Sequence, residues 1–256
     1  MAIVTISHEM GAGGPEIGQQ LGERLGYRYV DHELISDAAH RYGLLEDKLS
    51  HLDESKPSLF EFAEQDRVVL MGRGGQWLLR GISHHLRVRV MAPFECRVKR
   101  LAAKLAGPMG EKASPRTVME MIRRDDTERT GRMRYLYEVD LADPALYDLT
   151  INTEKVAVAT AVELIAGMVD RAELKTTDAG AQLVADRSLA SRVQVALATH
   201  PETRKYRITV EAKAGQVTLE GTAAMDEALD VARGVPGVRG VKAEQVDIPP
   251  IPPFVA

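Results

Sequence analysis

AIVTISHEMGAGG, residues 2–14, decides the fold because an apolar strand pattern runs directly into a glycine-rich turn. Pro15 follows, and Ile17, Leu21 and Leu25 then recur at helical spacing. Glycines let backbone N–H groups converge on one point without Cβ clashes, and the first turn of a helix adds the positive end of its dipole. The stretch predicts a phosphate-binding turn between a strand and a helix; the alternative is a glycine-rich turn without a ligand.

The turn nearly matches the nucleotide-binding motif G-x-x-x-x-G-K-[ST], in which the lysine reaches the β- and γ-phosphates and the hydroxyl holds Mg²⁺. Alignment of the following helix with that of a P-loop kinase places Gly14 at the lysine position and Glu16 at the hydroxyl position. Backbone groups can still bind phosphate here. The phosphate charge must then be balanced by side chains from elsewhere in the chain.

Composition limits the protein class. The chain has 256 residues with 33 basic and 37 acidic side chains, so its net charge of −4 gives no general electrostatic case for nucleic acid binding. The single Cys96 excludes an intramolecular disulfide and fits a reducing compartment. We find no secretory signal pattern and no apolar run near the roughly 18 residues that span a bilayer, so we expect a cytoplasmic protein without a transmembrane segment.

Strand and helix patterns alternate over the first 174 residues. Strands are expected at 2–6, 27–30, 67–71, 85–92 and 147–152, and helices after Asp31 and at 93–105, 114–134 and 156–174. This alternation predicts an α/β fold, a parallel sheet flanked by helices with ligands at the carboxyl ends of the strands.

The pattern changes after a small, polar stretch, which we interpret as a linker over residues 175–185. A helix from about Asp186 to Ala198, a hairpin over 207–221, a helix over 225–233 and a strand over 238–248 predict a small α+β (αββαβ) domain. Residues 249–256 form a proline-rich tail. The sequence therefore predicts domains at 1–174 and 186–248.

Four separated motifs in the first domain together resemble the cytidylate kinase-like family. They are ISHEMGAGG at 6–14, VLMGRG at 69–74, RRDDTER at 123–129 and DPALYDLTINT at 143–153. The resemblance covers roughly residues 1–170 and implies a P-loop kinase-like fold that moves the γ-phosphoryl of ATP to a nucleoside monophosphate, with Mg²⁺ as the accompanying ion. No residue of this chain is assigned as a metal ligand.

The C-terminal unit resembles a BON domain through VTLEG at 217–221 and VPGV at 235–238. BON domains are associated with phospholipid or protein interactions, so the resemblance implies a protein or phospholipid partner. A homo-oligomer is also considered, and no nucleic acid partner is expected.

Candidate site residues follow from these motifs. By resemblance, Arg73 matches an arginine that holds the acceptor nucleotide, and its planar guanidinium suits phosphate. Arg124, Arg129 and Arg132 match a lid whose arginines close over phosphates, although a solvated helix of mixed charge also explains that stretch. The expected catalytic residues are Arg73, Arg124 and Arg129. The expected nucleotide-binding residues are Ser7, Gly11, Ala12, Gly13, Gly14 and Arg132.

Three functions fit this sequence, and one of them is a scaffold that binds no ligand. The first is a cytidylate kinase-like phosphotransferase that uses ATP and carries a BON-like interaction domain. The second is a catalytically inactive nucleotide-binding regulator, a pseudokinase, whose BON-like domain binds a partner or a lipid. Gly14 and Glu16 favour the second function, whereas the four ordered motifs favour the first.

Overall fold

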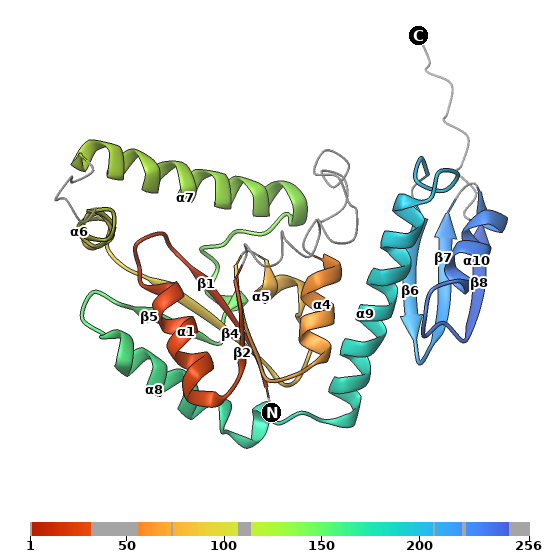
Figure 1. Cartoon of the computed structure of the whole chain (residues 1–256), viewed down its shortest axis with the longest axis horizontal. Coiled ribbons are helices and arrows are strands. Elements are labelled where there is room, and N and C mark those ends of the chain that lie inside the picture. Colours follow the sequence, from red (N-terminus) through yellow and green to blue (C-terminus); the bar gives the residue numbers. More distant parts are fainter. Residues whose placement is uncertain are drawn as a thin grey trace, which may run out of the picture. The chain divides into compact units, whose positions relative to one another are not determined.

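The protein folds into two compact units, shown in the computed structural model of Figure 1. The structure describes residues 2–31, 56–72, 74–106, 114–206, 208–221 and 224–245. The first unit contains residues 1–41 and 65–180, and the second contains residues 42–64 and 181–256. None of the helices in the described ranges combines the length and the apolar character that crossing a bilayer requires.

A five-stranded parallel sheet forms the first unit, in the order β2-β3-β1-β4-β5. Its strands are β1 (Ile3–His8), β2 (Arg28–Val30), β3 (Val68–Met71), β4 (His85–Met91) and β5 (Leu149–Asn152). The central strand β1 is apolar and buried along most of its length, as strands covered on both faces are. The parallel sheet predicted from the alternating pattern is confirmed.

Helices connect these strands. They are α1 (Gly14–Leu25), α5 (Gly75–Leu78), α6 (Phe94–Lys104), α7 (Pro115–Tyr137) and α8 (Val158–Val169), with short 3₁₀ turns at Pro144–Leu146 and Ala172–Leu174. Helix α1 packs against α8 beside the sheet (Figure 1). Ile17 and Leu21 of α1 and Ile165 of α8 share one buried core with the strands. This packing fixes where α1 begins, and therefore where the glycine-rich turn lies.

The carboxyl ends of four strands meet at one edge of the sheet. Glu9 N, just beyond β1, donates to Val90 O of β4 at 3.1 Å, and Thr153 N, just beyond β5, donates to Met91 O at 2.8 Å. Gly72 N, after β3, donates to Ile6 O at 3.3 Å. Three motifs that lie far apart in sequence therefore converge where parallel α/β sheets bind ligands.

Most predicted elements of this unit are confirmed, with small differences. Helix α7 runs from Pro115 to Tyr137, and Ser114 caps it by accepting a hydrogen bond from Thr117 N. The helix predicted over 156–174 is α8 plus a separate 3₁₀ turn, because α8 ends at Val169. The helix predicted after Asp31 lies outside the described residues, as does the tail at 249–256.

The second unit contains a three-stranded sheet in the order β6-β7-β8. Its elements are α4 (Lys56–Glu64), α9 (Asp178–Thr199, whose first turn belongs to the first unit), β6 (Ile208–Lys213), β7 (Gln216–Gly221), α10 (Met225–Arg233) and β8 (Gly240–Gln245). Strands β6 and β7 form an antiparallel hairpin, and β8 pairs parallel to β7. Leu197, Leu219 and Ala232 are central to its buried core. The predicted αββαβ order is confirmed.

Helix α9 begins at Asp178, earlier than the predicted start near Asp186. Thr177 Oγ1 accepts a hydrogen bond from Gly180 N at 3.0 Å, which satisfies one of the first N–H groups of the helix. The sequence reading missed this cap because small and polar residues also suit a linker. Within the second unit, Ser188 of α9 donates to Glu64 of α4 at 2.7 Å.

A buried histidine lies at the amino end of β4. His85 Nδ1 lies 3.1 Å from Leu79 O, and its Nε2 lies 2.8 Å from the hydroxyl of Thr5. A carbonyl oxygen only accepts, so Nδ1 carries the proton and Nε2 accepts from Thr5. Burial lowers the pKa of His85 from 6.5 to about 4, so the ring is neutral at pH 7.

Acidification should therefore destabilise the protein through His85. The unfolded chain binds a proton near pH 6.5 and the folded chain only near pH 4, so stability falls as pH drops between these values. The loss should reach roughly 3 kcal/mol. Urea unfolding of the wild-type protein and of His85→Asn, at pH values between about 4 and 6.5, measures this loss of stability. The prediction is wrong if both proteins lose stability equally.

Candidate functional site

The glycine-rich turn adopts a conformation that leaves the start of α1 open. Gly11 and Gly13 have φ values of 81° and 86°, which a residue with a Cβ rarely adopts. Gly13 is the N-cap of α1 and offers no side chain to its first turn. Early N–H groups of a helix lack intrahelical partners, so this end of α1 can donate to an anion.

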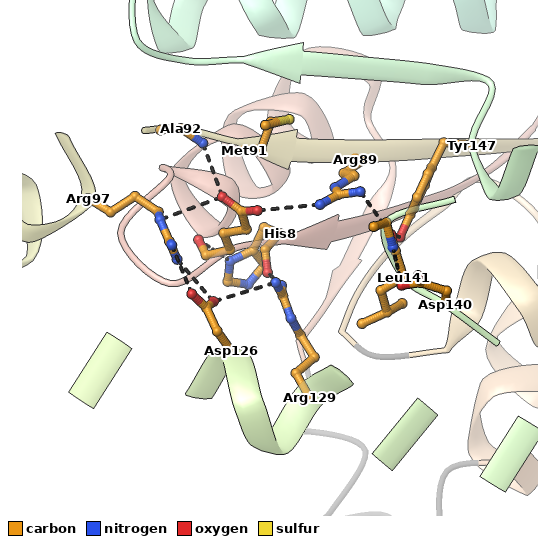
Figure 2. Close-up of polar contacts among 12 residues, drawn as sticks. His8, Arg89, Met91, Ala92, Arg97, Asp126, Arg129, Asp140, Leu141 and Tyr147 are labelled. Carbon is orange, nitrogen blue, oxygen red and sulfur yellow. Dashed lines mark hydrogen bonds and ion pairs between the residues drawn. The ribbon is translucent and has the colours of Figure 1, made fainter. Parts of the chain in front are cut away.

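Glu9 anchors the turn to neighbouring elements (Figure 2). One carboxylate oxygen lies 3.4 Å from Arg89 Nη2 of β4, and the other accepts from Ala92 N at 3.3 Å. The second oxygen also lies 3.5 Å from Arg97 Nε of α6. One partly buried acid therefore joins the turn after β1 to the end of β4 and to the helix that follows it.

Asp126 extends this network to α7. It accepts two hydrogen bonds from Arg97, at 3.0 and 2.8 Å, in a bidentate pair (Figure 2). Arg129, one turn further along α7, lies 3.7 Å from Asp126 and donates to the carbonyl oxygen of His8. Arg97 of α6 and Arg129 of α7 are both buried, so each of these helices contributes a buried positive charge next to the turn.

Burial shapes the electrostatics of this region. It lowers the pKa of Arg129, but a guanidinium stays protonated in a folded protein. Burial also lowers the pKa of His8 below 6.5, so this imidazole is neutral at pH 7 and adds no positive charge to the turn. The fixed positive charge near the turn therefore comes from arginines.

A cavity of about 590 Å³ opens beside the turn. Its walls come from the turn, from α6 and from the segment after β5. The lining residues are His8, Met10, Gly11, Gly13, Pro15, Glu16, Arg100, Leu101, Lys104, Leu105, Asp125, Thr153, Val156, Ala157 and Val158. Its size lies within the range of small-molecule sites, and its apolar walls carry a few polar groups, as such sites do.

Thr153 links the turn to α6. Its hydroxyl donates to Ala12 O at 2.8 Å and accepts from Arg100 Nη1 at 2.8 Å. Further along α6, Lys104 Nζ donates to Glu16 Oε1 at 2.9 Å. The cavity therefore has two basic side chains on one wall and the open start of α1 on the other.

The candidate site residues expected from the sequence lie in different environments in the structure. Ser7 is buried at the end of β1. Gly11 and Gly13 line the cavity. The carbonyl oxygen of Ala12 accepts a hydrogen bond from the hydroxyl of Thr153, and Gly14 is the first residue of α1. Arg129 contacts the turn, whereas Arg124 is 81% exposed and paired with Glu128 at 2.6 Å. Arg132 is exposed, and Arg73 lies outside the described residues.

The sequence-based candidates did not include four residues of this site: Arg97, Arg100, Lys104 and Thr153. A usable signal was present, because positions 97, 100 and 104 in the predicted helix over 93–105 are spaced three and four apart. Basic residues at that spacing lie on one helix face. The sequence did not show which element that face meets.

The sequence comparisons agree with this geometry. Residues 3–64 and 58–155 match the profile of the cytidylate kinase-like family, which is more than half of the chain. The chain belongs to the cytidylate kinase-like family. Residues 185–250 match the profile of the BON domain, so both expected resemblances are confirmed.

Known relatives cover the first domain. A cytidylate kinase of Sulfolobus acidocaldarius is 28% identical over 181 residues, which is 67% of this chain and 96% of that protein. A cytidylate kinase of Desulfurococcus amylolyticus is 26% identical over 181 residues, 67% of this chain and 94% of that protein. An uncharacterised protein of Eubacterium ventriosum superposes with a TM-score of 0.57 at 20% identity, over 66% of this chain and 99% of the other, which supports the fold.

Removal of the Asp126 carboxylate should destabilise the protein. In Asp126→Ala the buried guanidinium of Arg97 loses both bidentate hydrogen bonds, which should cost about 2 kcal/mol of unfolding free energy. Glu128→Ala is the matched control, because it removes an exposed ion pair on the same helix and should change little. Urea unfolding of the three proteins tests this, and equal stability of the two variants would contradict it.

A lysine introduced at the motif position should not fit. A Cβ on Gly14 would overlap Cβ and Cγ of His8, so Gly14→Lys should lower thermal stability through overpacking. Replacing His8 by glycine removes both of these atoms. Melting curves should therefore show a smaller penalty for Gly14→Lys in the His8→Gly background than in wild type; an equal penalty in both backgrounds would exclude His8 as the obstacle.

Proposed function

We propose that this protein is a phosphotransferase that moves the γ-phosphoryl of ATP to a nucleoside monophosphate or a similar small acceptor. One observation carries the proposal: the open start of α1, two basic side chains of α6 and an apolar-walled cavity of about 590 Å³ meet at one place. Phosphoryl transfer needs positioned phosphates and nearby positive charge more than it needs covalent chemistry. This arrangement supplies both.

The residues present fit a nucleoside triphosphate. Its phosphates would lie against the backbone of Gly11 to Gly14, where the helix start donates hydrogen bonds. Its base would lie between the apolar side chains of Leu101 and Val158, which line the same cavity. Arg100 is positioned at the phosphate side by its hydrogen bond to Thr153. ATP, when bound, supplies the transferable phosphoryl group.

The same residues do not fit a magnesium ion held by the protein. Glu9 is already engaged by Arg89, Arg97 and Ala92 N, and Ser7 is buried. Among the described residues, no group of three or more His, Cys, Asp or Glu side chains is placed to hold a metal. We propose that Mg²⁺ arrives bound to the nucleotide phosphates and keeps its water ligands, as this ion commonly does.

The acceptor is proposed to bind at the end of β3. The Gly72-Arg73-Gly74 sequence follows this strand directly, and Gly72 N donates to Ile6 O of β1. This places Gly72 at the edge of the sheet that also carries the glycine-rich turn. We assign to Arg73 the recognition of the acceptor phosphate, because a guanidinium binds two phosphate oxygens at once. Arg124 and Arg132 would serve as lid residues that approach the phosphates only on closure.

A nucleotide-binding regulator without activity is the second candidate. The ring of His8 occupies the space above Gly14, and Glu16 is paired with Lys104 where a P-loop kinase has its hydroxyl. These observations favour a site that binds nucleotide without transferring phosphate. In either case we propose that residues 186–248 act as a BON-type interaction domain for a protein or phospholipid, in the cytoplasm.

Phosphorus NMR with Mg²⁺, ATP and a panel of nucleoside monophosphates tests transfer directly. The kinase proposal expects ADP and one new nucleoside diphosphate, formed together and only with the right acceptor. Arg73→Ala should reduce turnover at least about a hundredfold while ATP still binds, because the acceptor phosphate loses its bidentate partner. Binding of ATP without transfer to any acceptor would favour the regulator.

A further inference from the structure

Helix α6 brings three basic residues to the glycine-rich turn. Arg97 forms an ion pair with Glu9 at 3.5 Å, and Arg100 reaches Ala12 O through the hydroxyl of Thr153. Lys104 contacts Glu16 in the first turn of α1 at 2.9 Å. Because they recur at helical spacing, the three side chains follow the turn from its start to the helix after it.

Lys104 differs from the two arginines in how firmly it is held. Arg97 is buried and has a bidentate carboxylate partner, and Arg100 is positioned by Thr153. The side chains of Lys104 and Glu16 are 64% and 44% exposed, and both line the cavity. An exposed single ion pair contributes little stability, so Lys104 can exchange Glu16 for another anion at small cost.

Glu16 is paired with Lys104 before a phosphate approaches. Partial burial of the Glu16 carboxyl acts to raise its pKa, but the hydrogen bond from Lys104, a backbone hydrogen bond and the positive charge of Lys104 together outweigh burial and lower the pKa below its ordinary value of 4.5. A charged carboxylate in the first turn of α1 would repel phosphate at that helix start. A cation beside it removes this repulsion and stands within reach of the same ligand.

We propose that Lys104 supplies, from α6, the phosphate-binding positive charge that the turn lacks at Gly14, and that Glu16 holds Lys104 beside the cavity until a nucleoside triphosphate binds. This inference rests on the proposed nucleotide site. The competing role for Lys104 is structural, since it lies in the last turn of α6, where a cation stabilises the helix dipole.

Calorimetric titration with ATP and Mg²⁺ separates these roles. Lys104→Ala should raise the Kd for ATP about tenfold, the effect of losing one charge-assisted hydrogen bond. Lys104→Arg should retain most of the affinity. Lys99→Ala is the matched control: it removes an exposed lysine of the same helix that does not line the cavity, and its Kd should stay within about twofold of wild type. Glu16→Gln should lower the Kd about two- to threefold, because the competing anion is removed.

Two results would overturn the inference. If wild type binds ATP and Lys104→Ala binds it as tightly as Lys99→Ala, Lys104 does not contact the phosphates, and the proposed function stands. If Lys104→Ala weakens ATP binding and also lowers the melting temperature of the unliganded protein, Lys104 acts by stabilising α6 instead. Absence of ATP binding by wild type would overturn both this inference and the proposed nucleotide site.

Discussion

The carboxylate of Glu9 holds the functional edge of this protein together. It accepts from the backbone at the end of β4 and faces two arginines, so the turn after β1 cannot move independently of β4 or α6. Asp126 then joins Arg97 to α7, whose Arg129 supports the backbone of His8. Each charge of this partly buried network is paired, and the pairing also sets the position of the glycine-rich turn.

In the complete P-loop motif a lysine of the turn reaches the phosphates, and this chain has Gly14 at that position. Shaping of the turn depends on the network of Glu9, Arg97 and Asp126, whose charges are already paired. Charge for a ligand must come from side chains that face the cavity, and Arg100 and Lys104 of α6 do so. The departures at Gly14 and Glu16 therefore do not leave the cavity without basic groups. They move those groups to a neighbouring helix.

The sheet of the second unit has one polar face. Along β6, buried Ile208 alternates with exposed Thr209, Glu211 and Lys213, so one face of its sheet packs on the helices and the other is polar. On β8, Lys242 and Glu244 form an exposed pair at 2.7 Å. This face therefore carries charges of both signs.

The sequence by itself determined the order of elements, the parallel sheet, the glycine-rich turn and the family, because these depend on local periodicity and on short motifs. It could not determine which arginines of α7 face inward: Arg124 and Arg129 look equivalent in sequence, yet one is exposed and the other is buried beneath the turn. Nor could it show that Arg97, Arg100 and Lys104 meet the turn. Both depend on how α6 and α7 pack, and Glu9 and Asp126, distant in sequence, fix that packing through ion pairs that only the tertiary structure forms.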